Sequence, residues 1–220
     1  MSITYLDKII CPCGEEFESE IIQSVSVSKN PELKEMILAG EFNVVPCPSC
    51  SQMLYIEKFV LYHDELQELI GFVYPKEMES KSESFLAEMD KSFAELQSNL
   101  SPEERFKYKP FLIFGMDTLC DLIRLEDNIS DEVQIADSIC NLMNLKKIRV
   151  RKDIARRKNI MPLLPVYSSN GKVKLGNLRE KTIEGLKKVL QENDALEHYQ
   201  QFLVKIESEP HWVLETYDFI

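Results

Sequence analysis

Several features that are common in enzymes are scarce in this chain of 220 residues. It holds seven glycines and no glycine-rich run, which excludes a phosphate-binding loop and a dinucleotide-binding fingerprint. With three histidines, the His63-Asp64 pair lacks the further ligands that a histidine-rich metallohydrolase needs. No stretch approaches the roughly 18 apolar residues that span a bilayer, and residues 1–16 lack the pattern of a signal peptide. We therefore expect a soluble, cytoplasmic protein.

The charge is acidic and unevenly distributed. The formal net charge is −11. Residues 1–78 hold five lysines against thirteen acidic residues, a net −8, whereas residues 79–220 carry only −3. An acidic chain is a poor general binder of nucleic acid and of anionic membranes. The composition therefore favours another protein as the partner, with no membrane and no nucleic acid, and it does not indicate an oligomeric state.

The hydrophobic patterns indicate an α+β protein whose first part, residues 1–78, is rich in strands. A short helix is predicted within this part, because Asn30-Pro31 has the pattern of a helix start and Gly40 that of a helix stop. Two apolar runs flank the polar stretch His63-Asp64-Glu65, which predicts a hairpin that turns there.

The second part, residues 79–220, is predicted to be mostly helical. The composition becomes polar at the end of residues 1–78 and helical periodicity follows, so we place a domain boundary at this point. One amphipathic helix is expected to begin at Asp131, with Ser130 as its N-cap. A short hairpin is expected near residues 165–175, where an Asn-Gly pair separates two alternating runs.

Four of the six cysteines form two tight groups, Cys11-Pro12-Cys13 and Cys47-Pro48-Ser49-Cys50. Paired cysteines in a reducing compartment more often bind metal or perform redox chemistry than form structural disulfides. Zinc favours four thiolates at the corners of a tetrahedron, and a short turn with two thiolates supplies half of them. The sequence therefore predicts one structural zinc ion held by Cys11, Cys13, Cys47 and Cys50.

Two other interpretations of these cysteines stay open. Cys47 and Cys50 have the spacing of a glutaredoxin-type active site, in which a following helix lowers the pKa of the first thiol. Here residues 51–56 favour a strand in place of that helix, so a thiol redox protein is disfavoured. In the second interpretation the thiols hold no ligand. The remaining cysteines, Cys120 and Cys140, lie among apolar residues and are expected to be small buried hydrophobes.

The chain resembles the CpXC-domain family, which is defined by two Cys-Pro-x-Cys-type motifs. Besides the cysteines, the resemblance rests on three segments: Asn30-Pro31-Glu32-Leu33-Lys34, Gly40-Glu41-Phe42-Asn43 and Leu61-Tyr62-His63-Asp64. It covers residues 3–76 and implies a zinc-ribbon-like metal site on an α+β domain, but no particular activity. The first cysteine pair is one residue shorter than the family pattern, and Ser51 follows the second pair where glycine is common.

A basic run, residues 146–158, stands out in this acidic chain. It has eight Lys and Arg residues against one acid, Asp153, for a net +7. Three interpretations are open: a solvated helix face, a surface that docks on the acidic residues 1–78 or on an acidic partner, and a nucleic-acid contact. The run holds no aromatic residue on which bases would stack, which weakens the last of these.

These observations favour a non-catalytic, zinc-binding interaction or adaptor protein. Four cysteine ligands leave no open position on zinc for water or substrate, so the metal is expected to be structural and no catalytic residue is assigned. The alternatives are an enzyme with a site between the two domains, and a thiol redox protein that uses Cys47 and Cys50.

Overall fold

The computed structural model describes residues 3–167 and 177–212. The chain divides into two compact units, residues 1–124 and residues 125–220. Helix α3 (Met116–Leu142) runs through the division, with its first residues in the core of the first unit and its later residues in the core of the second.

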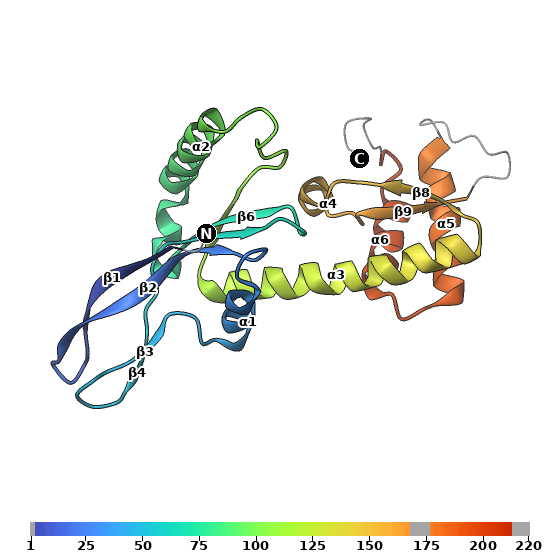
Figure 1. Ribbon diagram of the computed structural model, residues 1–220. Helices are drawn as coiled ribbons and strands as arrows, with labels where there is room; N and C mark the ends of the chain where they lie inside the picture. Colours follow the sequence, from blue (N-terminus) through green and yellow to red (C-terminus); the bar gives the residue numbers. More distant parts are fainter. Residues whose placement is uncertain (1–2, 168–176, 213–220) are drawn as a thin grey trace. The chain divides into compact units, whose positions relative to one another are not determined.

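The first unit is built on a sheet in which the described strands follow the order β1-β2-β5-β6-β7 (Figure 1). The β1/β2 and β5/β6 pairs are antiparallel, and the β2/β5 and β6/β7 pairs are parallel. These strands are β1 (Ile3–Ile10), β2 (Glu16–Ser26), β5 (Val60–Asp64), β6 (Leu69–Tyr74) and β7 (Phe111–Phe114). The other elements are α1 (Pro31–Ala39), β3 (Val44–Pro46), β4 (Met53–Tyr55), the 3-10 helix η1 (Lys76–Lys81) and α2 (Ser82–Asn99).

Strand β6 is buried on both faces because helices cover both sides of the sheet there. Its alternate side chains Ile70, Phe72 and Tyr74 belong to the core that includes Met89 of α2. The intervening residues face the other core, which α1 and the start of α3 complete. Figure 1 shows α2 on one side of the sheet and α1 with α3 on the other. This layered arrangement explains why β6 has a continuous apolar sequence.

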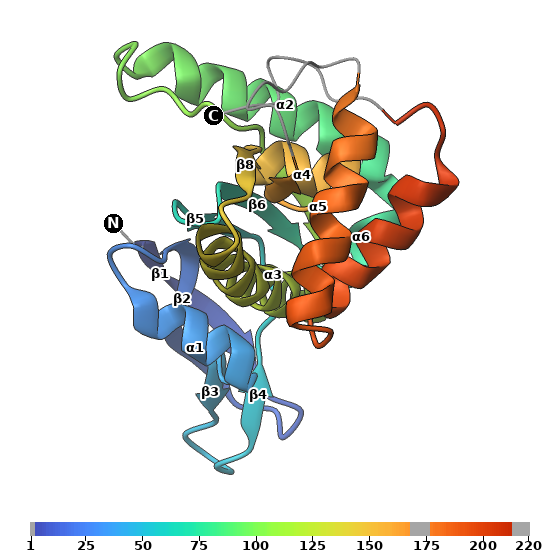
Figure 2. The ribbon, with the colours of Figure 1, turned by 90° about the vertical axis from the view of Figure 1, so that its right-hand side faces the viewer.

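The far end of the β1–β2 hairpin has a separate, small core. Ile9 and Ile21 of the hairpin pack there with Val45 of β3. Leu54 of β4 and Ile56, which follows β4 (Met53–Tyr55), are partly buried and pack against this cluster. Figures 1 and 2 show the β3–β4 ribbon beside this end of the hairpin. Two ribbons of the first unit are therefore held together by few apolar side chains.

The second unit combines the antiparallel pair β8–β9 with helices. Its elements are the later part of α3, β8 (Lys146–Arg149), α4 (Lys152–Lys158), β9 (Leu163–Val166), α5 (Leu178–Glu192) and α6 (Glu197–Ser208). Helix α5 packs directly on β9: a side chain at Gly185 would collide with the Pro165 carbonyl. The buried Tyr199 hydroxyl donates a hydrogen bond of 2.9 Å to the Leu163 carbonyl, so α6 is also tied to this strand.

The predicted α+β class is confirmed, as is the helix between Pro31 and Gly40. Gly40 has φ +72°, the left-handed conformation that ends many helices. The expected boundary at residue 78 falls between β6 and β7, which are neighbours in one sheet. The hairpin predicted near residues 165–175 lies largely outside the described residues; Pro165 and Val166 belong to β9.

One local prediction was wrong, and a second was correct except for the position of its turn. The helix expected to start at Asp131 is the second half of α3, which already begins at Met116. No proline or glycine interrupts this stretch, so Ser130 lies inside the helix instead of capping it. The hairpin predicted around His63-Asp64-Glu65 is confirmed by the antiparallel pair β5/β6, but His63 and Asp64 are the last residues of β5 and the turn begins at Glu65. The buried Asp64 carboxylate still serves this turn, since it accepts a hydrogen bond from the N–H of Gln67.

Candidate metal centre

Each of the two predicted cysteine groups lies in a turn at the end of a ribbon. Cys11 and Cys13 occupy the turn between β1 and β2, and Cys47 and Cys50 occupy the turn between β3 and β4. Because the small apolar core holds these two ribbons side by side, the structure brings all four cysteines together.

The two turns share one pattern of backbone hydrogen bonds, although the first turn is one residue shorter. In the first, the N–H of Cys11 donates to the carbonyl of Glu15, and the N–H of Gly14 donates back to the carbonyl of Cys11. In the second, the N–H of Cys47 donates to the carbonyl of Gln52, and the N–H of Ser51 donates back to Cys47. Gly14 and Ser51 both have positive φ, +96° and +61°. Ser51 therefore adopts the conformation for which glycine is favoured at this place.

The sulfur positions fit a tetrahedral metal ion. Four sulfurs at 2.3 Å from one zinc ion lie about 3.8 Å from each other. The Sγ atoms of Cys11 and Cys50 are 3.6 Å apart, and those of Cys13 and Cys47 are 3.7 Å apart. All four sulfurs lie within 4.8 Å of one another. Both of these distances join one turn to the other, as expected when both turns contribute to a single centre.

Burial and hydrogen bonds make the four thiols unequal. Cys11 and Cys47 are buried, whereas Cys13 and Cys50 face solvent. Burial opposes ionisation of Cys47, but hydrogen bonds from the N–H groups of Cys50 and Ser49, together with those from the thiols of Cys11 and Cys50, lower the pKa of Cys47 to about 7. The N–H of Cys13 favours ionisation of Cys11, but burial and the neighbouring sulfurs raise the pKa of Cys11 to about 12. Four thiolates this close together repel one another and require a cation.

The family model that describes CpXC proteins matches residues 9–135 of this chain. The chain belongs to the CpXC family. The match contains both cysteine turns and continues through β7 into α3, so it covers more of the chain than the segments noted in the sequence. The comparisons with curated proteins and with solved structures gave no match.

The redox interpretation finds little support in this CpXC protein. Cys47 and Cys50 are followed by β4, as the sequence indicated, and not by the helix that activates a glutaredoxin-type thiol. Cys120 and Cys140 are buried, with relative exposures of 9% and 0%, in agreement with their expected role as small hydrophobes.

Asn43 has a structural role that the sequence did not reveal. Its side-chain amide accepts a hydrogen bond of 2.9 Å from the N–H of Ile22 and donates one of 3.0 Å to the carbonyl of the same residue. It therefore fixes the chain just before β3 against β2, which sets where the second cysteine turn lies. Asn43 is part of the segment Gly40-Glu41-Phe42-Asn43, so the family resemblance carried a signal for it.

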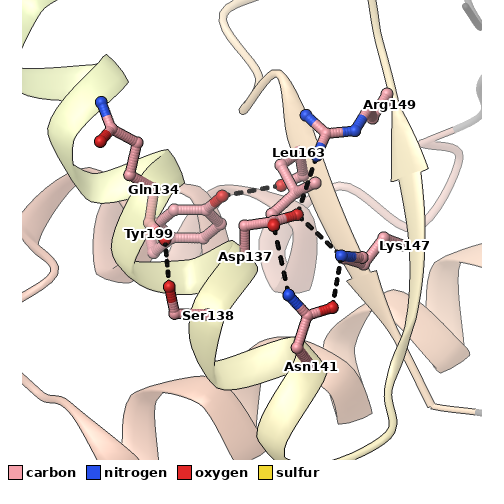
Figure 3. Close-up of polar contacts among 8 residues, drawn as sticks. All are labelled: Gln134, Asp137, Ser138, Asn141, Lys147, Arg149, Leu163 and Tyr199. Atoms are coloured by element: carbon pink, nitrogen blue, oxygen red, sulfur yellow. Dashed lines mark hydrogen bonds and ion pairs between the residues drawn. The ribbon is translucent and has the colours of Figure 1, made fainter.

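The basic run does not form one helix face: it is divided between β8 and α4. Several of its cations pair within the second unit. Lys147 and Arg149 both contact Asp137 of α3 at 2.9 Å, and the Lys147 ammonium lowers the pKa of this carboxyl (Figure 3). Arg156 forms a bidentate pair with Glu126, with distances of 2.6 and 3.0 Å. Part of the positive charge is therefore used to join β8 and α4 to α3.

A hollow of about 450 Å³ in the second unit is lined by polar and apolar residues of α3, α6 and the segment 159–161, among them His198, Gln201 and Lys205. His198 Nδ1 lies 2.7 Å from the Glu132 carboxylate. The same carboxylate accepts hydrogen bonds from the backbone N–H groups of His198 and Tyr199. Glu132 thus caps the first turn of α6, and its contact with the His198 side chain belongs to this cap.

Proposed function

We propose that this protein is a non-catalytic binding module, an adaptor, in which a structural zinc ion fixes two strand ribbons that present apolar side chains to a protein partner. Zinc is the metal best suited to four cysteine sulfurs at these distances. A closed set of four thiolates leaves no position for substrate, which supports a structural role for the ion.

One observation carries the adaptor proposal: both ribbons that end in cysteine turns expose large apolar residues. Leu6 and Ile10 of β1 are 66% and 71% exposed, and Met53 and Tyr55 of β4 are 59% and 49% exposed. Exposed apolar residues gathered on one element often mark a contact with another protein. Zinc that joins the two ribbons would fix the positions of both sets.

The cellular setting belongs to the same proposal. In the described parts of the chain, no helix is both long and apolar enough to cross a membrane. A cytoplasmic location fits thiols that must stay reduced to hold a metal. An enzyme has weaker support, since Glu132, the carboxylate beside His198, is occupied with capping α6.

Site-directed photo-crosslinking tests the adaptor proposal. A photoreactive amino acid is placed at Leu6 or Tyr55, and as a control at Leu86, an equally apolar and 47% exposed residue of α2. We expect a discrete crosslinked protein from Leu6 and Tyr55 in lysate of the native host, and none from Leu86. If all three positions give the same products, or none gives a product, the ribbons are not a docking surface.

A further inference from the structure

Strand β1 forms one end of the five-stranded sheet. It pairs with β2 on one side, and its other edge has no partner strand among the described residues. A free edge presents backbone N–H and C=O groups to which an extended segment from another chain can add as a further strand. Natural edge strands usually prevent this with several charged residues, but one face of β1 exposes the apolar Leu6 and Ile10 with Lys8 as its one charged residue. The other charged residue of β1, Asp7, lies on the opposite face and pairs with Lys58.

The register of β1 and β2 places a row of glutamates on β2 directly opposite the exposed residues of β1. This row is called the acidic row. On the face that points away from the small core, Leu6 lies opposite Glu20, Lys8 opposite Glu18, and Ile10 opposite Glu16. Directly opposed residues of an antiparallel pair lie on the same face, about 5 Å apart. All six residues on this face are exposed.

The outer two carboxylates of the row lack a cation. Lys8 lies across from Glu18 and offsets its charge, whereas Glu16 and Glu20 have apolar residues as their neighbours on β1. No described residue forms an ion pair with Glu16, Glu18 or Glu20. The face therefore carries a net charge of −2, concentrated at two points that are four residues apart along the strand.

We propose that the free edge of β1 binds an extended, basic segment of a partner protein that carries Lys or Arg at positions i and i+4. This rests on the adaptor function proposed above and names the chemistry of the partner. On an added strand, these two side chains would lie beside Leu6 and Ile10. Their aliphatic stems cover the apolar residues, and their charged ends reach across β1 toward Glu20 and Glu16, about 10 Å from the added strand.

The spacing is the specific part of this inference. Residues i and i+4 of a strand lie on one face, about 13 Å apart, whereas residues i and i+3 lie on opposite faces. Anionic surfaces such as nucleic acid or an acidic membrane would be repelled by the same carboxylates. A second copy of the chain would bring an identical acidic row, which makes it a poorer occupant than a basic segment.

Fluorescence anisotropy with short labelled peptides tests the proposal on the full zinc-loaded chain. The probe is a Thr- and Val-rich peptide with two arginines four positions apart. Three control peptides are used. The first has the same composition with the arginines three positions apart, the second has glutamates in place of the arginines, and the third carries N-methyl groups along one backbone edge. We expect each control to bind at least about tenfold more weakly, because each removes charge pairing or strand pairing.

Matched protein variants separate this face from general acidity. Glu16→Gln/Glu20→Gln should weaken binding of the i, i+4 peptide at least about tenfold. Glu83→Gln/Glu88→Gln, which removes two exposed carboxylates from α2, should leave it unchanged. The proposal is overturned if peptides with the two arginine spacings bind with equal affinity, or if both protein variants weaken binding equally. Sedimentation that shows self-association lost in Leu6→Asp would assign the edge to a second copy instead.

The peptide and crosslinking experiments fail in distinguishable ways. If crosslinks at Leu6 capture a protein while the i, i+4 peptide does not bind, the adaptor function stands and the basic segment is rejected. If neither experiment gives a signal, both proposals are rejected.

Discussion

Cys47→Ser should release the metal and unfold the far end of the first unit. A serine hydroxyl does not ionise at neutral pH, so the variant keeps three thiolates and loses the tetrahedral set. Among the described residues, the apolar core beneath the cysteines has only Ile9, Ile21 and Val45 as buried members, too few to hold two ribbons without the ion. In small zinc modules the binding energy of the metal, roughly 10–16 kcal/mol in peptides, is folding energy.

Hydrogen exchange measures this effect for each strand. In Cys47→Ser, the amides of β1, β3 and β4 should exchange at least about 100-fold faster, equivalent to about 3 kcal/mol of lost protection. Amides of α5 and α6 in the second unit should be unchanged. Cys120→Ser is the matched control, because Cys120 lies outside the cluster and a serine can keep its hydrogen bond to the Ile37 carbonyl. Normal protection in the metal-free variant would show that the ion is incidental to the fold.

Glu126→Ala should destabilise the second unit by about 3–5 kcal/mol, the usual result of removing one partner of a buried ion pair. The side chains of Glu126 and Arg156 are 7% and 8% exposed, and both oxygens of the carboxylate are bonded to the guanidinium. The variant leaves the Arg156 charge buried without this carboxylate. Trp212, the single tryptophan, packs on Phe202 in the second unit, so its fluorescence in a urea titration reports the unfolding of this unit.

Two further variants decide whether the buried charge is the cause. Asp131→Ala removes an exposed carboxylate from the same helix and should change stability by less than about 0.5 kcal/mol. Glu126→Leu/Arg156→Met removes both charges and should recover most of the lost stability. If this double variant is as unstable as Glu126→Ala, the pair matters through its shape and not through its charge.

Local chemistry explains what the sequence predicted well. The cysteine cluster was predicted from two short motifs, because four cysteine sulfurs in such motifs commonly bind one zinc ion. Helix α1 was predicted from Pro31 and Gly40, because proline favours the first position of a helix and glycine favours the left-handed conformation that ends one. The strand after Cys50 was recognised for the same reason, since residues 51–56 favour a strand by themselves.

Long-range contacts explain what the sequence did not predict. Strand β7 joins β6 after an intervening helix, and nothing in residues 111–114 indicates which strand they pair with. The partners of the basic run, Asp137 and Glu126, lie on α3. The sequence pattern at Ser130 predicted a helix start inside α3, so it did not place both carboxylates on one helix. The acidic row behind β1 was visible as alternate glutamates in β2, but its position opposite Leu6 and Ile10 required the strand register.

Metal content and coordination test the central claim most directly. The protein is purified without a metal-affinity tag, its zinc is quantified, and X-ray absorption at the zinc edge reports the ligands. We predict about one zinc ion per chain, bound by four sulfurs at about 2.3 Å. Protein that is folded but holds no metal, or zinc coordinated by nitrogen or oxygen in place of any of the four cysteines, would contradict the account.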